Sequence, residues 1–145
     1  MDSKTDSKTD TMNEIKFRFN PASSKSKKVL GPLEGEIMDV VWEQGTTTVS
    51  AVHKALRERK DVAYTTVMTT MGRLAKKNLL HQDTSSSTYL YTPVLSHQDF
   101  GRYVVMGVIK ALIDDYGDLV FDCVAEIANE EGGTGKERLR SALGK

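Results

Sequence analysis

The chain has 145 residues, 39% of them hydrophobic, so it can bury one ordinary core, or two small ones if another subunit completes the second. Its basic and acidic residues cancel overall, but residues 25–97 hold ten Lys or Arg against seven Asp or Glu, and residues 98–145 hold six against nine. This asymmetry indicates a polyanion-binding module beside a module with another role. One cysteine excludes an internal disulfide framework, and neither a leader nor an apolar run of membrane-spanning length is recognisable, so we expect a cytoplasmic protein.

Residues 1–29 predict a flexible N-terminal extension. The repeated DSKT and the near absence of apolar residues before Ile15 are typical of a disordered segment. The Ser and Lys run at 23–28 could follow a phosphate backbone as a basic arm, or could be a solvated linker. The first residues could equally be an extension ahead of a start at Met12.

A first helix is expected to begin at Pro32, because proline suits the first helical position, and to end at Gly45. Trp42 is expected to pack into the core. Glu34 and Glu36 lie near the positive end of the helix dipole, which explains them better than a catalytic carboxylate pair does. The apolar stripe of this helix consists of Leu33, Ile37, Val40 and Val41.

A short strand at 46–48 and a second helix are expected next. Thr48 is a suitable cap for this helix, which would extend to about Arg59. The polar turn 60–61 leads to a third helix within residues 63–80, AYTTVMTTMGRLAKKNLL. In the third helix apolar residues recur at the spacing of one buried face, at Val67, Met71 and Leu74.

The other face of the third helix is small and polar, then basic. Short hydroxyls let a helix approach a surface closely, and cations can meet phosphates or guanine edges. A solvated polar face is the alternative interpretation. Two helices joined by a tight connection form the helix-turn-helix pattern. On this interpretation the DNA-contacting residues of the helix are Thr65, Thr66, Met68, Thr69, Arg73, Lys76 and Lys77.

A β-hairpin is predicted directly after the third helix. Residues 80–83 and 88–91 alternate in polarity and enclose a serine turn. Such a hairpin is a wing. Its tip, which includes Ser86, can donate hydrogen bonds to phosphates but cannot insert into the minor groove.

These segments together resemble the penicillinase-repressor (BlaI/MecI) family of dimeric winged-helix repressors. The resemblance rests on LGPLEGEIMDVVW, VSAVHKAL, the 63–80 stretch and YLYTPV, over about 30–94. It implies binding of a two-fold symmetric operator, with Thr65, Thr66, Thr69 and Arg73 at the groove-facing positions. Three residues depart from the family pattern. Ala63 replaces the usual serine cap, Met68 lies where several members carry a basic residue, and Asn78 replaces the usual glycine but tolerates the left-handed conformation.

The tail, residues 96–145, predicts three more helices. The first, capped by Ser96 with Asp99, is apolar on almost every side, which implies a partner because so short a tail cannot bury it alone. Thr134 with Glu137 is expected to cap the last. The resemblance implies that these helices form the dimer interface. The residues assigned to it are Phe100, Val104, Val108, Leu112, Leu119, Val120, Val124, Ile127 and Leu139.

The sequence thus predicts a mainly α protein, with a winged helix-turn-helix domain of three helices and a hairpin at 30–95 and a helical dimerisation region at 96–145. The favoured function is a homodimeric, sequence-specific repressor, which the resemblance connects with β-lactam resistance or stress-response genes. The alternative is a protein-interaction scaffold without DNA binding. Arg73 with Lys76 and Lys77 favours DNA, since a docking face more often exposes aromatic anchors.

Other chemistry finds little support in the sequence. His53, His81, His97 and Cys123 are too scattered for a structural zinc site, so we expect neither metal nor cofactor. Cys123 is interpreted as a small core residue rather than a redox sensor. No phosphate loop, nucleophile elbow or acid–base cluster occurs, which favours a protein that is not an enzyme.

The sequence differs from the family resemblance at the site that is cut when repression is lifted. Family members that answer β-lactams are cut by a membrane sensor protease at an Asn-Phe pair in the second tail helix. The matching place here holds Asp122-Cys123, and the chain contains no Asn-Phe pair. Because a protease pocket selects particular side chains, we expect no cleavage at this place.

Overall fold

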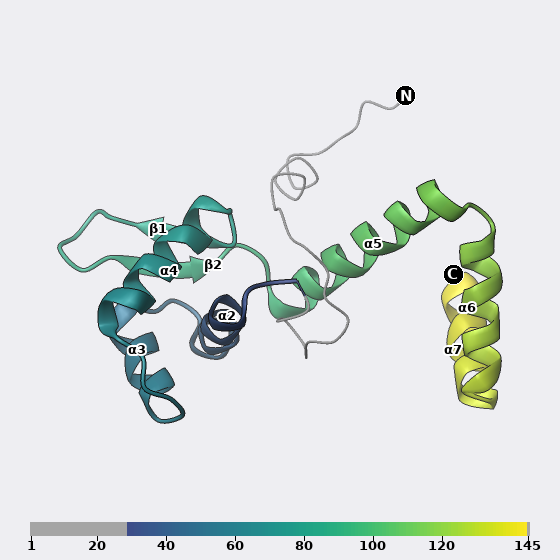
Figure 1. The fold of residues 1–145 in the computed structure, drawn as a ribbon, viewed down its shortest axis with the longest axis horizontal. Coiled ribbons are helices and arrows are strands. Elements are labelled where there is room, and N and C mark those ends of the chain that lie inside the picture. The colour runs from purple at the N-terminus through teal and green to yellow at the C-terminus, as the bar shows by residue number, and fades with distance from the viewer. Residues whose placement is uncertain (1–28, 145) are drawn as a thin grey trace. The chain divides into compact units, whose positions relative to one another are not determined.

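The computed structural model describes residues 29–144, and nearly all of the predicted extension, with the basic run and Met12, lies outside the described residues. The chain divides into two compact units, one up to Val104 and the other from Val105. Both units are mainly helical (Figure 1). No helix in the described range is long and apolar enough to cross a membrane.

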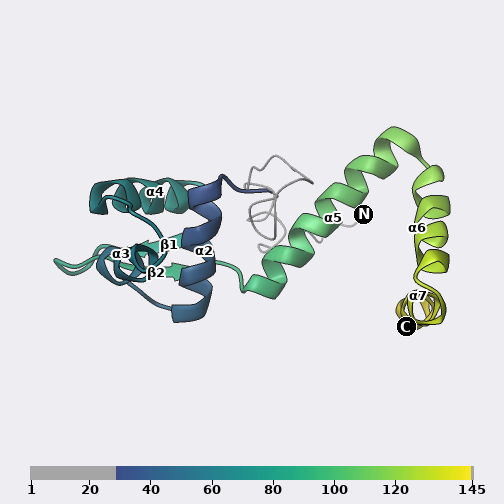
Figure 2. The same cartoon turned by 60° about the horizontal axis from the view of Figure 1, so that its bottom comes forward.

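The first unit consists of three helices and a hairpin. Helix α2 packs against α3, α4 and the second strand, as Figure 2 shows, and the hairpin follows α4 directly. The strands are antiparallel, with Leu80 opposite Pro93 and Asp83 opposite Leu90. This is the predicted winged helix-turn-helix arrangement, and its elements are α2 (Pro32–Gln44), α3 (Val49–Arg57), α4 (Tyr64–Lys76), β1 (Leu80–Asp83) and β2 (Leu90–Pro93).

Local chemistry fixes the helix ends largely as predicted. Gly45 ends α2 with a φ of 77°, and Thr48 caps α3 by accepting the Ala51 N–H at 3.1 Å. Ala63 offers α4 no side-chain cap, and Asn78 adopts the expected left-handed conformation with a φ of 64°. Helix α3 ends at Arg57, two residues earlier than the sequence suggested.

The core joins the apolar stripes of the three helices. The side chains at its centre have no exposed area and come from α2, α3 and α4: Ile37, Val41, Val52, Leu56, Val67, Met71 and Leu74. Trp42 is half-buried at its margin, and its indole Nε1 donates to the Leu95 carbonyl at 2.9 Å. The predicted buried faces of all three helices are therefore confirmed, although Leu33 is only half-buried.

Two predictions about strands were wrong in detail. The segment 46–48 forms one bridge, Thr47 with Tyr91, rather than a strand, and β2 begins at Leu90 rather than at Thr88. Tyr91 explains both differences. Its ring is buried, its backbone exchanges two hydrogen bonds with Thr47, and its hydroxyl accepts a bond from Gln82 at 2.7 Å, which leaves residues 88–89 in the turn.

Helix α5 (His97–Tyr116) begins within the first unit. Ser96 caps it as predicted, accepting the Asp99 N–H at 3.0 Å. Phe100 is 3% exposed and lies 5.3 Å from Trp42 between ring centroids, and Val104 packs against the same core. Phe100 and Val104, which the sequence assigned to a dimer interface, thus pack against the core of the first unit in the single chain.

The second unit holds the rest of α5 with α6 (Leu119–Glu130) and α7 (Gly133–Leu143). Helices α6 and α7 pack against each other so closely that a Cβ on Gly135 would lie 2.6 Å from the Ala128 carbonyl oxygen. The predicted Thr134–Glu137 cap was wrong. Gly132, with a φ of 74°, precedes the helix instead, and Thr134 lies within its first turn.

Candidate DNA-binding surface

The exposed face of α4 carries most of the predicted contact residues. Its buried side is anchored by the fully buried Val67, Met71 and Leu74. Thr70, on the same side, donates its hydroxyl to the Thr66 carbonyl at 2.7 Å. The structure exposes six of the predicted residues together on the outer side of this helix: Thr65, Thr66, Met68, Thr69, Arg73 and Lys76.

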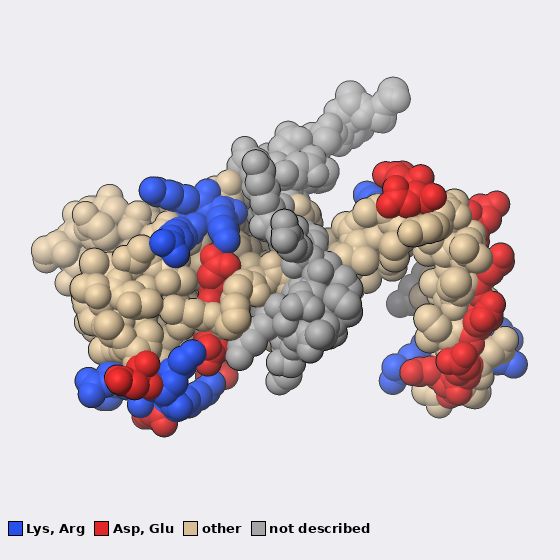
Figure 3. All heavy atoms as spheres, viewed as in Figure 1, with Lys and Arg blue, Asp and Glu red and all other residues tan. Residues whose placement is uncertain are grey.

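One edge of this face is hydroxyl-rich and ends in a cation. Thr65, Thr66, Thr69 and Arg73, with Thr70, line a shallow open hollow. Figure 3 shows basic side chains gathered over the end of α4. Small hydroxyls followed by a guanidinium form a surface that can lie close to DNA, donate to phosphates and make a bidentate contact with guanine.

The predicted contact residue Lys77 has an intramolecular partner. Its amine lies 2.7 Å from Glu34 Oε2, and the other oxygen of that carboxylate accepts the Gly31 N–H at 3.0 Å. Burial alone would raise the pKa of Glu34, but the bonds from Lys77 and Gly31 and the charges of Lys77 and Arg73 outweigh it and hold that pKa below its usual value. Glu34 thus ties the start of α2 to the end of α4, and Glu36 similarly pairs with Lys60 at 2.9 Å.

The wing tip is ordered by its own short side chains. Ser86 donates its hydroxyl to the Thr88 carbonyl at 2.8 Å, so only its oxygen lone pairs are free for a further contact. The Ser85 N–H donates to Asp83, and the bonds from Ser85 lower the pKa of that carboxyl. The tip therefore carries a carboxylate beside its serines, which limits how strongly it can attract a phosphate.

Around the predicted contact residue Met68, the structure adds residues that the sequence did not single out. A trough of about 470 Å³ lies between α4, the start of α3 and the wing. Tyr64 and Met68 from α4 and Tyr89 from the wing tip expose 43%, 45% and 48% of their area. The other residues lining the trough are mostly small or hydroxyl-bearing: Thr48, Val49, Ser50, Gly72, Gln82, Ser87, Thr88 and Tyr91. Tyr64 lies four residues before Met68, and this helical spacing could have identified Tyr64 from the sequence. The strand pairing that places Tyr89 in the turn could not have been predicted in the same way.

The second unit exposes apolar surface instead. A groove of about 350 Å³ between α5 and α6 is lined almost wholly by apolar side chains: Ile109, Leu112, Tyr116, Leu119, Val120, Cys123, Val124 and Ile127. Five of the predicted interface residues are among them. Cys123 is exposed here, so its interpretation as a core residue was wrong for the single chain. Val108 and Leu139, also predicted, are half-buried outside this groove.

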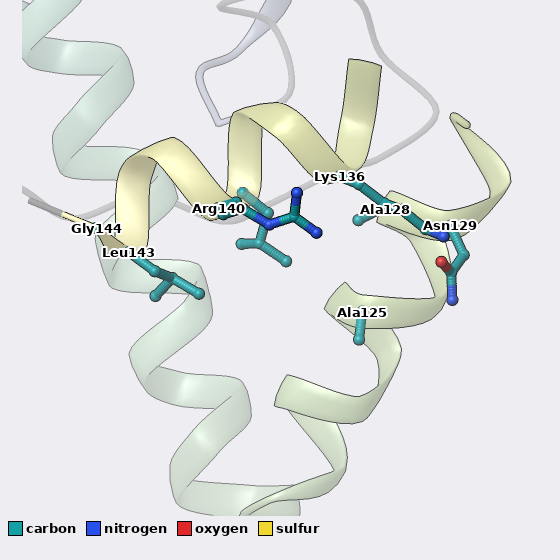
Figure 4. A pocket seen from close by; sticks show the side chains of 8 residues that line it. Ala125, Ala128, Asn129, Lys136, Arg140, Leu143 and Gly144 are labelled. Atoms are coloured by element: carbon teal, nitrogen blue, oxygen red, sulfur yellow. The ribbon is translucent and has the colours of Figure 1, made fainter. Parts of the chain in front are cut away.

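A second hollow, of about 500 Å³, lies between α6 and α7 (Figure 4). Ala125 and Ala128 contribute from α6, and Lys136, Arg140 and Leu143 from α7. The outer side of α6 carries an acidic residue every fourth position, and Figure 3 shows the resulting stripe. The net negative charge of the tail is therefore concentrated on one helix face.

His53 and His97 both have structural contacts within the first unit. His53 Nε2 lies 2.8 Å from the Val62 carbonyl oxygen, and His97 stacks on Trp42 with ring centroids 4.5 Å apart. Within residues 29–144, no three His, Cys, Asp or Glu side chains come together in a way that could hold a metal ion.

Three helices around one buried core, a hairpin wing and an exposed Thr/Arg face on the third helix define a winged helix-turn-helix protein. The sequence pattern described as "Penicillinase repressor" matches residues 30–140, so the chain belongs to the penicillinase repressor family. That family consists of transcriptional regulators rather than of enzymes.

Individual relatives match about half of the chain. The chain is 50% identical over 66 residues to "Transcriptional regulator BlaI" of Mycobacterium tuberculosis, in strains CDC 1551 / Oshkosh and ATCC 25618 / H37Rv, which is 45% of this chain and 48% of each relative. The matched stretch thus spans about half the length of these curated relatives. The solved structure "Solution structure of the DNA binding domain of the repressor BlaI" is 27% identical with a TM-score of 0.44, over 48% of this chain and 85% of that one.

Proposed function

We propose that the protein is a cytoplasmic transcriptional repressor that binds a two-fold symmetric DNA operator as a homodimer. The observation that carries the proposal is the exposed Thr65–Thr69–Arg73 edge of α4, set on three fully buried side chains. A rigid helix with short hydroxyls and a terminal guanidinium suits entry into a major groove, where arginine makes bidentate contacts with guanine.

Homodimerisation is proposed from the apolar surface of the second unit. In the single chain, Leu119, Phe121 and Ile127 of α6 each expose more than half of their area, and Ile109 and Leu112 of α5 are also exposed. Contiguous exposed apolar surface of this kind marks interaction sites in soluble proteins. A two-fold dimer would place two copies of α4 in successive major grooves, about 34 Å apart, and occlude a promoter by its bulk.

The family name suggests genes of β-lactam resistance or stress response as targets. A membrane sensor protease is the corresponding upstream signal in this proposal. Asp122 and Cys123 do not supply an Asn-Phe pair, so we propose that release of the operator does not use a cut at that place.

The test is an electrophoretic mobility shift with DNA from upstream of the protein's own gene. Full-length wild type should retard the fragment at nanomolar concentration and resist competitor DNA, and Arg73→Ala should lose this specific complex. Arg102→Ala is the charge-matched control, because Arg102 is exposed and belongs to α5 rather than to α4. Light scattering would give the mass of the free protein. Equal retardation of specific and random fragments by wild type would contradict the proposal.

A further inference from the structure

Gly72 is an unexplained glycine in the middle of α4. Glycine is the poorest helix former after proline, and here its φ lies outside the left-handed region. A Cβ built on Gly72 would meet no atom within 4 Å from the rest of residues 29–144, apart from the neighbouring backbone of α4 itself. Neither helix geometry nor packing within the described residues therefore requires glycine. Gly72 is thus a position where the α4 backbone is open to approach from outside the described residues.

Gly72 belongs to a row that differs from the hydroxyl-rich edge. Tyr64, Met68 and Gly72 follow one another at four-residue spacing, beside the row of Thr65, Thr69 and Arg73. Met68 is 45% exposed and lines the trough between α4 and the wing with Tyr64 and Gly72. This row of α4 is thus apolar at Met68 and has no side chain at Gly72, one turn further along the helix.

A bare and apolar edge matches one chemical feature of the major groove. The 5-methyl group of thymine is the apolar group that base edges present there, whereas the other positions offer hydrogen-bond donors and acceptors. A methionine thioether is flexible and polarisable and has no strong donor or acceptor to satisfy. A single exposed methionine elsewhere on the surface would need no explanation. Met68 needs one, because it lies on the proposed groove-facing helix one turn from Gly72.

We propose that Met68 reads the methyl group of a thymine in each operator half-site and that Gly72 lets the α4 backbone approach the base edges closely enough for that contact. This rests on the proposed DNA-binding function and adds a base preference to it. Arg73 and the threonines then supply polar contacts from the opposite edge of the same helix.

The test uses duplexes selected from a random pool by the full-length wild-type protein. In the enriched duplex each thymine is replaced in turn by deoxyuridine, which removes only the methyl group. At one symmetric thymine position, replacement in one half-site should lower the affinity of the protein for the duplex about fourfold. Replacement in both half-sites should lower that affinity roughly fifteenfold. Met68→Ala should bind more weakly and show no further loss at that position, and Met68→Leu should keep the dependence.

The outcomes separate the two proposals. If no duplex is enriched, the proposed DNA-binding function itself fails. If a motif is enriched but no thymine is sensitive to uracil replacement, or Met68→Ala shows the same sensitivity as wild type, the methyl contact is overturned while the function stands.

Gly72→Ala tests the clearance. It should raise the unfolding temperature by a few degrees, because alanine favours the helix, and lower affinity for the selected duplex by about tenfold or more. Gly101→Ala is the matched control: Gly101 lies inside α5, where a Cβ also meets nothing within 4 Å. It should stabilise similarly and leave affinity unchanged. Wild-type affinity in Gly72→Ala would overturn the role of Gly72.

Discussion

Glu34 holds Lys77 by an ion pair, so removing its charge should change DNA binding and stability in opposite directions. Glu34→Gln keeps an acceptor for the Gly31 N–H but releases the Lys77 amine, which lies 2.7 Å from the carboxylate. The Glu34 side chain is 16% exposed and that of Lys77 40%, so the lost pair should cost at most about 1 kcal/mol of folding free energy. Glu34→Ala also removes the cap and should cost about 1 kcal/mol more.

The freed lysine adds a cation beside Arg73 and Lys76. If it then neutralises one more phosphate, the plot of log affinity against log salt should steepen by about 0.9 for each protomer bound. Between 50 and 200 mM salt that corresponds to roughly a three- to fourfold extra loss of affinity per protomer. The assay is fluorescence anisotropy with a labelled duplex at several salt concentrations, with chemical denaturation run in parallel. An unchanged slope in Glu34→Gln would refute the view that Glu34 restrains a phosphate-binding lysine.

Four further outcomes are expected. Arg73→Ala should lose about 1 to 3 kcal/mol of specific binding per half-site and keep its fold, measured by anisotropy and circular dichroism. Charged residues at Val108 and Leu112 should give monomers by light scattering, because unpaired charge is costly in an apolar interface. Because folding lowers the pKa of Glu34, its ionised carboxylate stabilises the protein at pH values above its ordinary pKa of 4.5. This stabilisation should be lost as the pH falls further and should be absent in Glu34→Gln, which acid unfolding of both proteins would measure. Immunoblots of β-lactam-treated cells should show no fragment ending at Asp122.

Local chemistry made much of the first unit predictable. Helical spacing identified the buried sides of α2, α3 and α4, and single residues such as Thr48 and Asn78 identified a cap and a left-handed position. These signals depend on neighbours within one or two turns. The residues of the exposed α4 face followed from the same periodicity, since whatever is not buried must face outward.

Features that depend on distant residues were not predictable. Lys77 and Glu34 lie 43 positions apart, so their pairing has no local signature. Phe100 belongs to an apolar run whose periodicity is equally compatible with a partner subunit, and only the position of Trp42 assigns it to the first unit. The register of the wing depends on Tyr91 meeting Thr47, which placed Tyr89 in the turn and thereby completed the trough.

The glycine at position 135 bears on the entropy change of the proposed dimerisation. Gly135 has no side chain, so the start of α7 can lie directly against the Ala128 carbonyl of α6. Any larger residue at position 135 would push the two helices apart. Side chains on a fixed helix pair lose less conformational freedom when a second subunit covers them than side chains on a fluctuating helix would. The ordering cost of α6 is thus met during folding of the single chain. In the proposed homodimer, Gly135 would contribute to subunit affinity in this way without needing to touch the other subunit.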